Sequence, residues 1–192
     1  MDYEYDAFFS YKRDRESDDW HKVVKEKLAF WVGTELGLEV KIFFDTEDIR
    51  TGARWRQKLA NALKKSRCLI CVWSPLYFRS KWCLSEFKSF LKREELNKRD
   101  LVMPASYCDG ESFPPEAQSR QILKFDEFTS TMPMFWKTDS AFYFERDLLK
   151  KFAKDLAEMI RQSPPYDEAF PIIEASDQEV CPEQTIGRVA NA

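Results

Sequence analysis

The chain has 192 residues, of which 44% are hydrophobic, 15% aromatic and 33% charged, with a formal net charge of −3. This length fits one domain with an extension, and the apolar share is sufficient for a buried core. A slightly acidic chain generates no global positive field and holds no run near the roughly 20 apolar residues of a membrane span, so we expect neither direct nucleic-acid binding nor membrane contact.

The first part of the chain alternates apolar runs with helical patterns. Tyr5–Ser10 is a short apolar run, typical of a buried strand. Apolar residues then recur at helical spacing from Trp20 to Trp31. Glu39–Phe44 predicts a second strand, and a loop over Asp45–Ala53 leads to a helix that carries apolar residues from Trp55 to Leu63. The pattern is strand, helix, strand, loop and helix.

The same alternation continues in the second part. Cys68–Trp73 predicts a third strand. It ends at Ser74, a favourable N-cap, followed by Pro75 at the first helical position. A helical region containing Trp82 and Glu86 comes next. Weaker strands over 101–104 and 121–125 and a last helix over 144–161 complete the predicted elements.

The composition changes after Gln162. Residues 163–192 contain prolines and several acidic residues, no lysine, and little periodicity. We therefore predict one domain over residues 1–162 and a linker or tail over 163–192, of the kind that leads to a further domain in a longer protein.

Strands that alternate with helices favour a mostly parallel sheet covered on both faces, an α/β fold. In a doubly wound sheet, ligands bind beyond the carboxyl ends of the strands, at the switch point between the first and third strands. Three segments are predicted to meet there, namely Ser10–Ser17, Asp45–Ala53 and Ser74–Trp82. The last of them leads into the helix of Glu86.

In this arrangement Glu86 is the most informative residue about function. On a helix, Trp82 and Glu86 are neighbours because they are four residues apart. The apolar stripe of the helix is centred on Leu84, Phe87 and Phe90, so Glu86 falls at its margin. A partly desolvated carboxylate needs a partner or a task. Either Glu86 is a boundary residue bonded to a backbone amide, or it is a functional group in the cleft.

Histidine and cysteine provide little catalytic machinery. His21 is the one histidine among the 192 residues, which weakens any mechanism based on imidazole and most zinc sites. Cys68 and Cys71 are three residues apart on a predicted strand and so point to opposite faces, where they cannot share a metal. We expect no metal site and free, buried cysteines in a reducing cytoplasm.

Taken together, the motifs resemble a Toll/interleukin-1 receptor (TIR) domain over roughly residues 3–161. The order and spacing of several short segments carry the resemblance. They are Tyr5-Asp6-Ala7-Phe8-Phe9-Ser10-Tyr11, Phe44-Asp45 with Ile49 and Gly52, Trp55, Leu59, Leu63 and Ser66, Val72-Trp73-Ser74-Pro75-Leu76-Tyr77, and Ser80-Lys81-Trp82-Cys83 with Glu86. The intact tryptophan–cysteine–glutamate run is more similar to the bacterial and plant-like branch than to animal receptor adaptors.

The resemblance implies a flavodoxin-like three-layer sandwich with a five-stranded parallel sheet. In that branch it implies cleavage of NAD⁺ between nicotinamide and ribose, with Glu86 as the catalytic glutamate, no required cofactor, and activity on self-association with other TIR domains. The residues it places around NAD⁺ are Ser10, Tyr11, Lys12, Arg13, Asp45, Ser74, Tyr77 and Trp82.

Each supporting residue also has a structural interpretation. Trp82 either stacks on substrate or walls the cleft, and the basic turn at Lys12 and Arg13 either contacts substrate or is solvated. Asp45 either binds a hydroxyl or caps the next helix, and Ser74 is an N-cap first. Trp55 is expected in the core. Two departures from the family pattern are a loop without proline before Gly52 and a poorly matching region over 109–136.

One carboxylate is sufficient for this chemistry. The nicotinamide of NAD⁺ is a pyridinium, so it leaves as a neutral molecule without a general acid, unlike an ordinary glycoside. The enzyme hypothesis is therefore an NAD⁺ glycohydrolase or cyclase in immune signalling or NAD⁺ depletion. An interaction module that recruits partners through an exposed Ile49 is the alternative from another class. A nucleoside deoxyribosyltransferase also uses a glutamate but fits the motif order less well.

Overall fold

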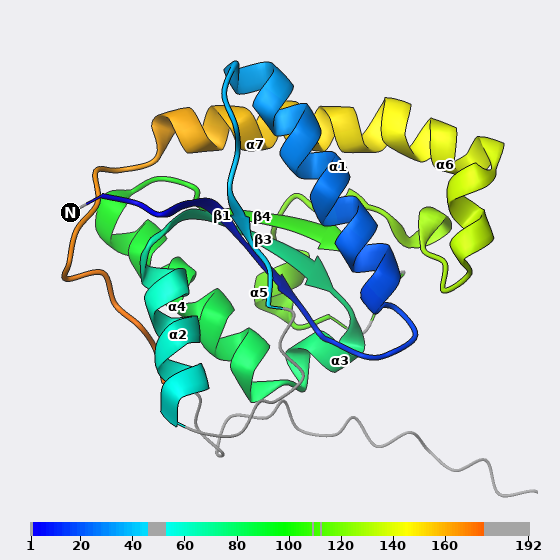
Figure 1. Cartoon of the computed structure of the whole chain (residues 1–192). Helices are drawn as coiled ribbons and strands as arrows, with labels where there is room; N and C mark the ends of the chain where they lie inside the picture. Colours follow the sequence, from blue (N-terminus) through cyan, green and yellow to red (C-terminus); the bar gives the residue numbers. More distant parts are fainter. Residues whose placement is uncertain (1, 46–52, 109, 112, 175–192) are drawn as a thin grey trace, which may run out of the picture.

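Five parallel strands form a single sheet in the order β2-β1-β3-β4-β5. The computed structural model describes residues 2–45, 53–108, 110–111 and 113–174. Figure 1 shows the strands crossing the centre of the molecule. Their bounds are β1 Tyr5–Tyr11, β2 Ile42–Phe43, β3 Ser66–Trp73, β4 Val102–Ser106 and β5 Leu123–Lys124. The predicted flavodoxin-like fold is confirmed, because this strand order is that of a doubly wound sheet.

Helices cover both faces of the sheet (Figure 1). On one face lie α1 (Asp18–Leu36) and α7 (Lys150–Gln162), and on the other α2 (Ala53–Lys64) and α4 (Lys81–Asn97). The shorter elements are α3 Pro75–Phe78, α5 Pro115–Gln118, the 3₁₀ turns η1 Asp126–Phe128 and η2 Pro133–Lys137, α6 Asp139–Tyr143 and the π-helical segment η3 Phe144–Leu149.

Alternation along the strands divides the core into two layers. On β1, Phe9 packs towards α1 and α7, whereas Phe8 packs towards α2 and α4. On β3, Cys68 and Cys71 follow the same rule and lie in different layers, as their spacing predicts. Both thiols are free and buried, and burial raises the pKa of each above its ordinary range. The CxxC spacing is therefore a packing feature.

The edge strands are shorter than the apolar runs suggest. The sequence predicts strands over 39–44 and 121–125, but only Ile42–Phe43 and Leu123–Lys124 pair. β2 and β5 are the edge strands, so each is stabilised by hydrogen bonds to one neighbouring strand. An apolar run with high β-propensity therefore forms a shorter strand here than it would in the centre of the sheet. At the start of β2, the backbone N–H of Lys41 donates instead to the Asp6 carboxylate, at 2.9 Å.

Pro104 lies inside β4, a position that usually excludes proline. The N–H of Tyr107 donates to Trp73 O at 2.7 Å, so alternate residues of β4 face β3. Pro104 therefore turns its missing N–H towards β5, whose pairing with β4 begins only at Ala105. The proline removes no hydrogen bond from the centre of the sheet.

The last helix begins earlier than the sequence predicts. The expected range is 144–161, whereas α6, η3 and α7 run together from Asp139 to Gln162. Thr138 starts this run as its N-cap, because its Oγ1 accepts from the N–H of Ala141 at 3.4 Å. Phe144, Phe152 and Leu156 are fully buried against the sheet, as the periodicity predicts.

Glu94 fastens the carboxyl-terminal end of α4 to the sheet. Its Oε1 accepts from the backbone N–H groups of Leu101 and Val102, at 2.7 and 2.9 Å. Its Oε2 accepts from Arg120 Nη2 at 2.5 Å. Charge-assisted bonds of this kind are stronger than neutral ones, so this end of α4 is held in a fixed place at the entry to β4.

The predicted linker or tail covers 163–192, of which the structure describes 163–174. These residues, here named the C-terminal strap, run from the end of α7 past α4 and α2 (Figure 1, orange). Phe170 is only 6% exposed. The hydroxyl of Tyr3 donates to Pro164 O at 2.9 Å. The described part of this segment is thus packed against the domain.

His21 lies on α1 between two tyrosine rings. Its ring centroid is 4.4 Å from that of Tyr11 and 5.2 Å from that of Tyr107, with interplanar angles of 29° and 20°. Its Nδ1 lies 2.7 Å from Ser17 O, so this nitrogen carries the proton and donates. Burial lowers the pKa of His21 from 6.5 to about 4.

This histidine makes the folded state sensitive to mild acid. The unfolded chain binds a proton near pH 6.5 while the folded chain does not until about pH 4. Stability is therefore complete above pH 6.5 and is lost as the pH falls towards 4, by about 2 kcal/mol at pH 5. We expect His21→Phe to lose about 2 kcal/mol less than the wild type between pH 7 and pH 5 in urea unfolding. Equal losses in the two proteins would contradict this assignment.

Candidate functional site

A small cavity opens at the carboxyl ends of β1 and β2, where the sequence places the cleft. Its volume is about 70 Å³. Most of the residues expected around the substrate line it, namely Ser10, Tyr11, Lys12, Arg13, Asp45, Trp82 and Glu86. They come from β1 and the turn after it, from the end of β2, and from the first two turns of α4. This is the switch point of the sheet, as expected for a doubly wound fold.

Glu86 is held inside this cavity and is only 8% exposed. It lies on the second turn of α4, which Ser80 starts as an N-cap by accepting from the N–H of Cys83 at 3.4 Å. Ser10 Oγ, at the end of β1, donates to Glu86 Oε2 at 2.5 Å. The carboxylate is therefore tied to the sheet through a side chain, and the interpretation as a cleft residue fits better than that of a helix boundary.

Tyr77 supports Ser10 from behind. The two hydroxyl oxygens are 2.8 Å apart, and Tyr77 OH is also 3.4 Å from Cys71 Sγ. Because the single hydrogen of Ser10 goes to Glu86, Tyr77 donates in the bond to Ser10, and its hydroxyl hydrogen is shared between the nearer Ser10 Oγ and the more distant Cys71 Sγ. Burial raises the pKa of Tyr77 well above its usual range, with further contributions from Cys71, Cys83 and Glu86. Tyr77 thus stays protonated and remains a donor.

Ser74 and Tyr77 lie outside the cavity wall, although the resemblance places both near NAD⁺. Ser74 Oγ accepts from the N–H of Tyr77 at 3.2 Å and caps α3, as predicted from Ser74-Pro75. Tyr77 is 0% exposed, and its hydroxyl is connected to the site through Ser10. Both therefore position other groups in this structure.

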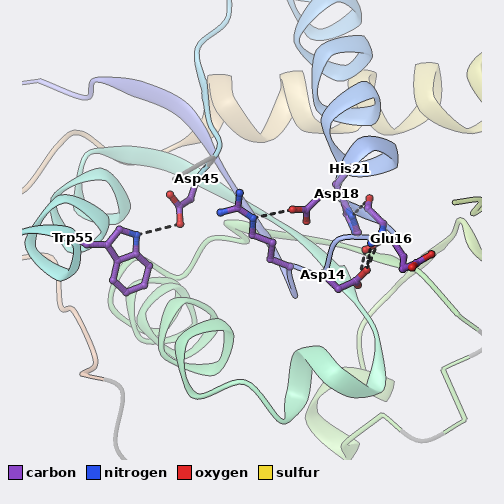
Figure 2. Close-up of polar contacts among 8 residues, drawn as sticks. Asp14, Glu16, Asp18, His21, Asp45 and Trp55 are labelled. Carbon is purple, nitrogen blue, oxygen red and sulfur yellow. Dashed lines mark hydrogen bonds and ion pairs between the residues drawn. The ribbon is translucent and has the colours of Figure 1, made fainter. Parts of the chain in front are cut away.

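The turn after β1 is held by its own carboxylates (Figure 2). Asp14 Oδ1 accepts from the N–H groups of Glu16 and Ser17, both at 2.9 Å, and Oδ2 accepts from Ser17 Oγ at 2.7 Å. Arg13 Nε donates to Asp18 Oδ2 at 2.9 Å. These contacts fix the course of the backbone from the strand into α1, and with it the basic edge of the cavity.

Two tryptophans form one wall of the site. The Trp55 and Trp82 ring centroids are 5.0 Å apart at 83°, an edge-to-face pair. Trp55 Nε1 donates to Asp45 Oδ2 at 3.3 Å, the bond that Figure 2 shows as a dashed line between the two side chains. Trp55 is buried, as predicted, but it also lines the cavity, and sequence reasoning missed this second role. Its place in the first turn of α2, beside the loop that starts at Asp45, was the available signal.

A second, larger cavity adjoins the first at Trp82. Its volume is about 300 Å³, and it runs between α2, α4 and the C-terminal strap. Glu86, Trp82 and Leu59 line both cavities. Glu86 thus lies where two neighbouring cavities meet, a feature that the sequence did not predict because the composition of the strap is that of a linker.

The predicted loop over Asp45–Ala53 falls largely outside the described residues, so Ile49 and Gly52 have no structural account. Among the described residues, no group of three or more histidine, cysteine or acidic side chains is placed to hold a metal ion. Within the same part of the chain, no helix combines the length and apolar character needed to cross a bilayer.

Comparison with known proteins places the chain in a family. The model of the TIR domain matches residues 8–133. The chain is 27% identical over 130 residues to the NAD(+) hydrolase TirS of Staphylococcus aureus (strain MSSA476), covering 66% of this chain and 44% of that protein. It is 33% identical over 145 residues to Toll-like receptor 4 of Pinctada imbricata, covering 71% and 15% respectively. The chain therefore spans less than half the length of these curated relatives.

Among solved structures, the TIR domain of the Toll-related receptor TRR-2 from Hydra magnipapillata is similar. It is 23% identical, with a TM-score of 0.45, over 74% of this chain and 99% of that chain. The family match covers both the strand that ends at Ser10 and the helix that carries Glu86. The chain belongs to the TIR domain family.

Proposed function

We propose that this domain cleaves NAD⁺ at the bond between nicotinamide and ribose. The observation that carries the proposal is the buried carboxylate of Glu86, held by Ser10 at the switch point of the sheet. The relative TirS, named as an NAD(+) hydrolase, supports the same reaction. The activity would serve immune signalling or NAD⁺ depletion.

The proposed reaction separates a neutral leaving group from a sugar cation. The C1′–N bond breaks and its electron pair stays with nicotinamide, which cancels the positive charge of the pyridinium. Glu86 stabilises the charge that develops on the ribose by a fixed electrostatic interaction. A water molecule then adds to C1′ and loses a proton, or an atom of the substrate itself closes a ring. The step needs no general acid, so we propose that no cofactor is required.

The residues around Glu86 have separate roles in this proposal. Lys12 and Arg13 face the negative diphosphate, and Asp45 accepts from a ribose hydroxyl. Trp82 contacts the substrate with its indole. Tyr11 stacks on His21 and holds this edge of the cavity. Ser10 orients the carboxylate, and Ser74 and Tyr77 support Ser10 from outside the cavity.

We further propose that the domain acts when it associates with other TIR domains. We place the activity in the cytoplasm, where NAD⁺ is present and free thiols such as those of Cys68 and Cys71 persist. The need for association is tested by measuring nicotinamide release at several protein concentrations. Specific activity should rise with protein concentration. Mass spectrometry of the product distinguishes ADP-ribose from a cyclic isomer.

Glu86→Gln should reduce nicotinamide release by at least about a hundredfold, because it removes the charge while keeping the shape of the side chain. The matched control is Glu95→Gln, an exposed position on the same helix, which should retain full activity. Circular dichroism and thermal unfolding should show the same fold in all three proteins. A Glu86→Gln protein with wild-type turnover would refute the enzymatic proposal.

An adaptor function is the alternative that the similarity to Toll-like receptor 4 favours. An adaptor would leave NAD⁺ unchanged even when assembled, and would tolerate Glu86→Gln. It would instead lose partner binding on substitution of Ile49. Glu86→Gln and a substitution of Ile49 together therefore distinguish the two functions.

Tyr77→Phe tests whether the hydrogen-bond chain behind Glu86 matters to the reaction. Ser10 then loses the hydrogen bond that it accepts and is less well fixed. We expect kcat for NAD⁺ cleavage to fall about fivefold, equivalent to about 1 kcal/mol, with little change in KM.

The control is Tyr143→Phe, which removes a hydroxyl from a tyrosine that is 48% exposed and lies on α6. Its kcat should match that of the wild type. An equal effect of the two substitutions, or a changed KM with constant kcat in Tyr77→Phe, would argue against a positioning role for Tyr77.

A further inference from the structure

The larger cavity beside Glu86 owes its outer wall to the C-terminal strap. Ile172, Ile173 and Glu174 of the strap line it, opposite Leu59 of α2 and Trp82 of α4. The strap residues lie outside the residues matched by the family model, 8–133. This wall is therefore a feature of this chain beyond the matched part of the domain.

Two serines of α4 hold the strap backbone at the cavity. The N–H of Ile173 donates to Ser89 Oγ at 2.8 Å, and Ser85 Oγ donates to Ile173 O. Ser89 Oγ in turn donates to Ser85 O at 2.7 Å. Because Ser85 and Ser89 are one turn apart, both face the strap. The peptide groups of Ile173 are satisfied, so the wall next to Glu86 has a defined position.

A buried arginine holds the strap a few residues earlier. The guanidinium carbon of Arg93 lies 4.2 Å from the ring centroid of Phe90 and 4.3 Å from that of Phe170, so the cation is held between two aromatic faces. Arg93 is fully buried, and its Nη1 donates to Ser66 O at 2.8 Å. The strap is thus joined to the domain at two points on α4.

The chemistry of the cavity fits a flat, positively charged ring. Its volume, about 300 Å³, is at the lower end of the range for small-molecule sites. Aliphatic side chains and the indole of Trp82 supply apolar surface. Of the charged residues that line the cavity, Glu86 and Glu174 are acidic and Arg56 is basic, so the lining has a net negative charge. An organic cation is favoured by aromatic faces and by carboxylates. Glu86 also lines the cavity at the strand ends, together with Lys12 and Arg13.

We propose that this cavity receives the nicotinamide ring of NAD⁺, with the strap as one wall of the leaving-group site. The inference rests on the proposed function. The ribose and diphosphate then lie on the strand-end side of Trp82 and the ring on the strap side. The bond that breaks passes beside Glu86, which lines both spaces. On cleavage the ring becomes neutral, so its interaction with Glu174 weakens as it departs.

Glu174→Gln tests whether the cavity distinguishes the charged nicotinamide ring of NAD⁺ from neutral free nicotinamide. In the active protein we expect KM for NAD⁺ to rise about threefold, while inhibition by free nicotinamide stays unchanged because that molecule carries no charge. The control is Glu168→Gln on the same strap, whose carboxylate lies 3.8 Å from Lys64 and outside the cavity. It should change neither quantity. Equal effects of the two substitutions on KM would overturn the inference.

Ile172→Ala tests the apolar wall. Loss of this contact should weaken inhibition by nicotinamide and raise KM for NAD⁺, each about fivefold, with thermal unfolding as the check on the fold. Unchanged inhibition by nicotinamide would overturn the inference. If Ile172→Ala does not fold, Glu174→Gln, at the exposed end of the strap, provides the test instead.

Direct binding keeps the inference separate from the reaction. The probe is 1-methylnicotinamide, a pyridinium cation without ribose, titrated by NMR of the indole N–H signals. A shift of the Trp82 signal that requires higher probe concentrations in Glu174→Gln and Ile172→Ala supports the cavity even if NAD⁺ is not cleaved. Absence of any shift overturns it. Cleavage that proceeds unchanged in both variants leaves the enzyme proposal standing and removes the strap from it.

Discussion

The hydrogen bond from Ser10 to Glu86 is the interaction on which the candidate site depends. It joins the end of β1 to the second turn of α4, through two residues that are 76 positions apart in sequence. Tyr77 extends the connection to α3, directly after β3. The carboxylate is therefore placed by three elements that meet at the switch point. A side chain on a rigid strand and a capped helix is oriented more accurately than one on a loop.

Sequence reasoning could predict the parts of this arrangement that depend on local patterns. The strands β1 and β3 follow from short apolar runs, the cap at Ser74 from a serine followed by proline, and the opposite faces of Cys68 and Cys71 from their spacing. Glu86 could be selected because a carboxylate at the margin of an apolar stripe is an unusual placement. These features need only residue type and the periods of helix and strand.

The rest depends on contacts between distant residues. Nothing local in the sequence indicates that Tyr77 donates to Ser10, because that bond requires the sheet to have formed. Trp55 reads as core since it begins an apolar stripe, yet its indole reaches Asp45. The prolines and acidic residues of the strap predict a linker, yet Phe170 packs against the buried guanidinium of Arg93 and the rings of Tyr3 and Tyr166. The composition of a segment does not indicate whether the segment packs against the rest of the domain.

The clamp at Glu94 has a mechanical consequence for α4. Its carboxyl-terminal end is bonded to the backbone of β4 and to Arg120, whereas Glu86 lies eight residues away, about 12 Å along the axis. Ser10 of β1 holds Glu86 nearer the start of the same helix. A rigid helix bonded to the sheet at two separate points cannot tilt freely, so a displacement of the carboxylate would have to be accompanied by a displacement of the end of β1 or by loss of its bond to Ser10.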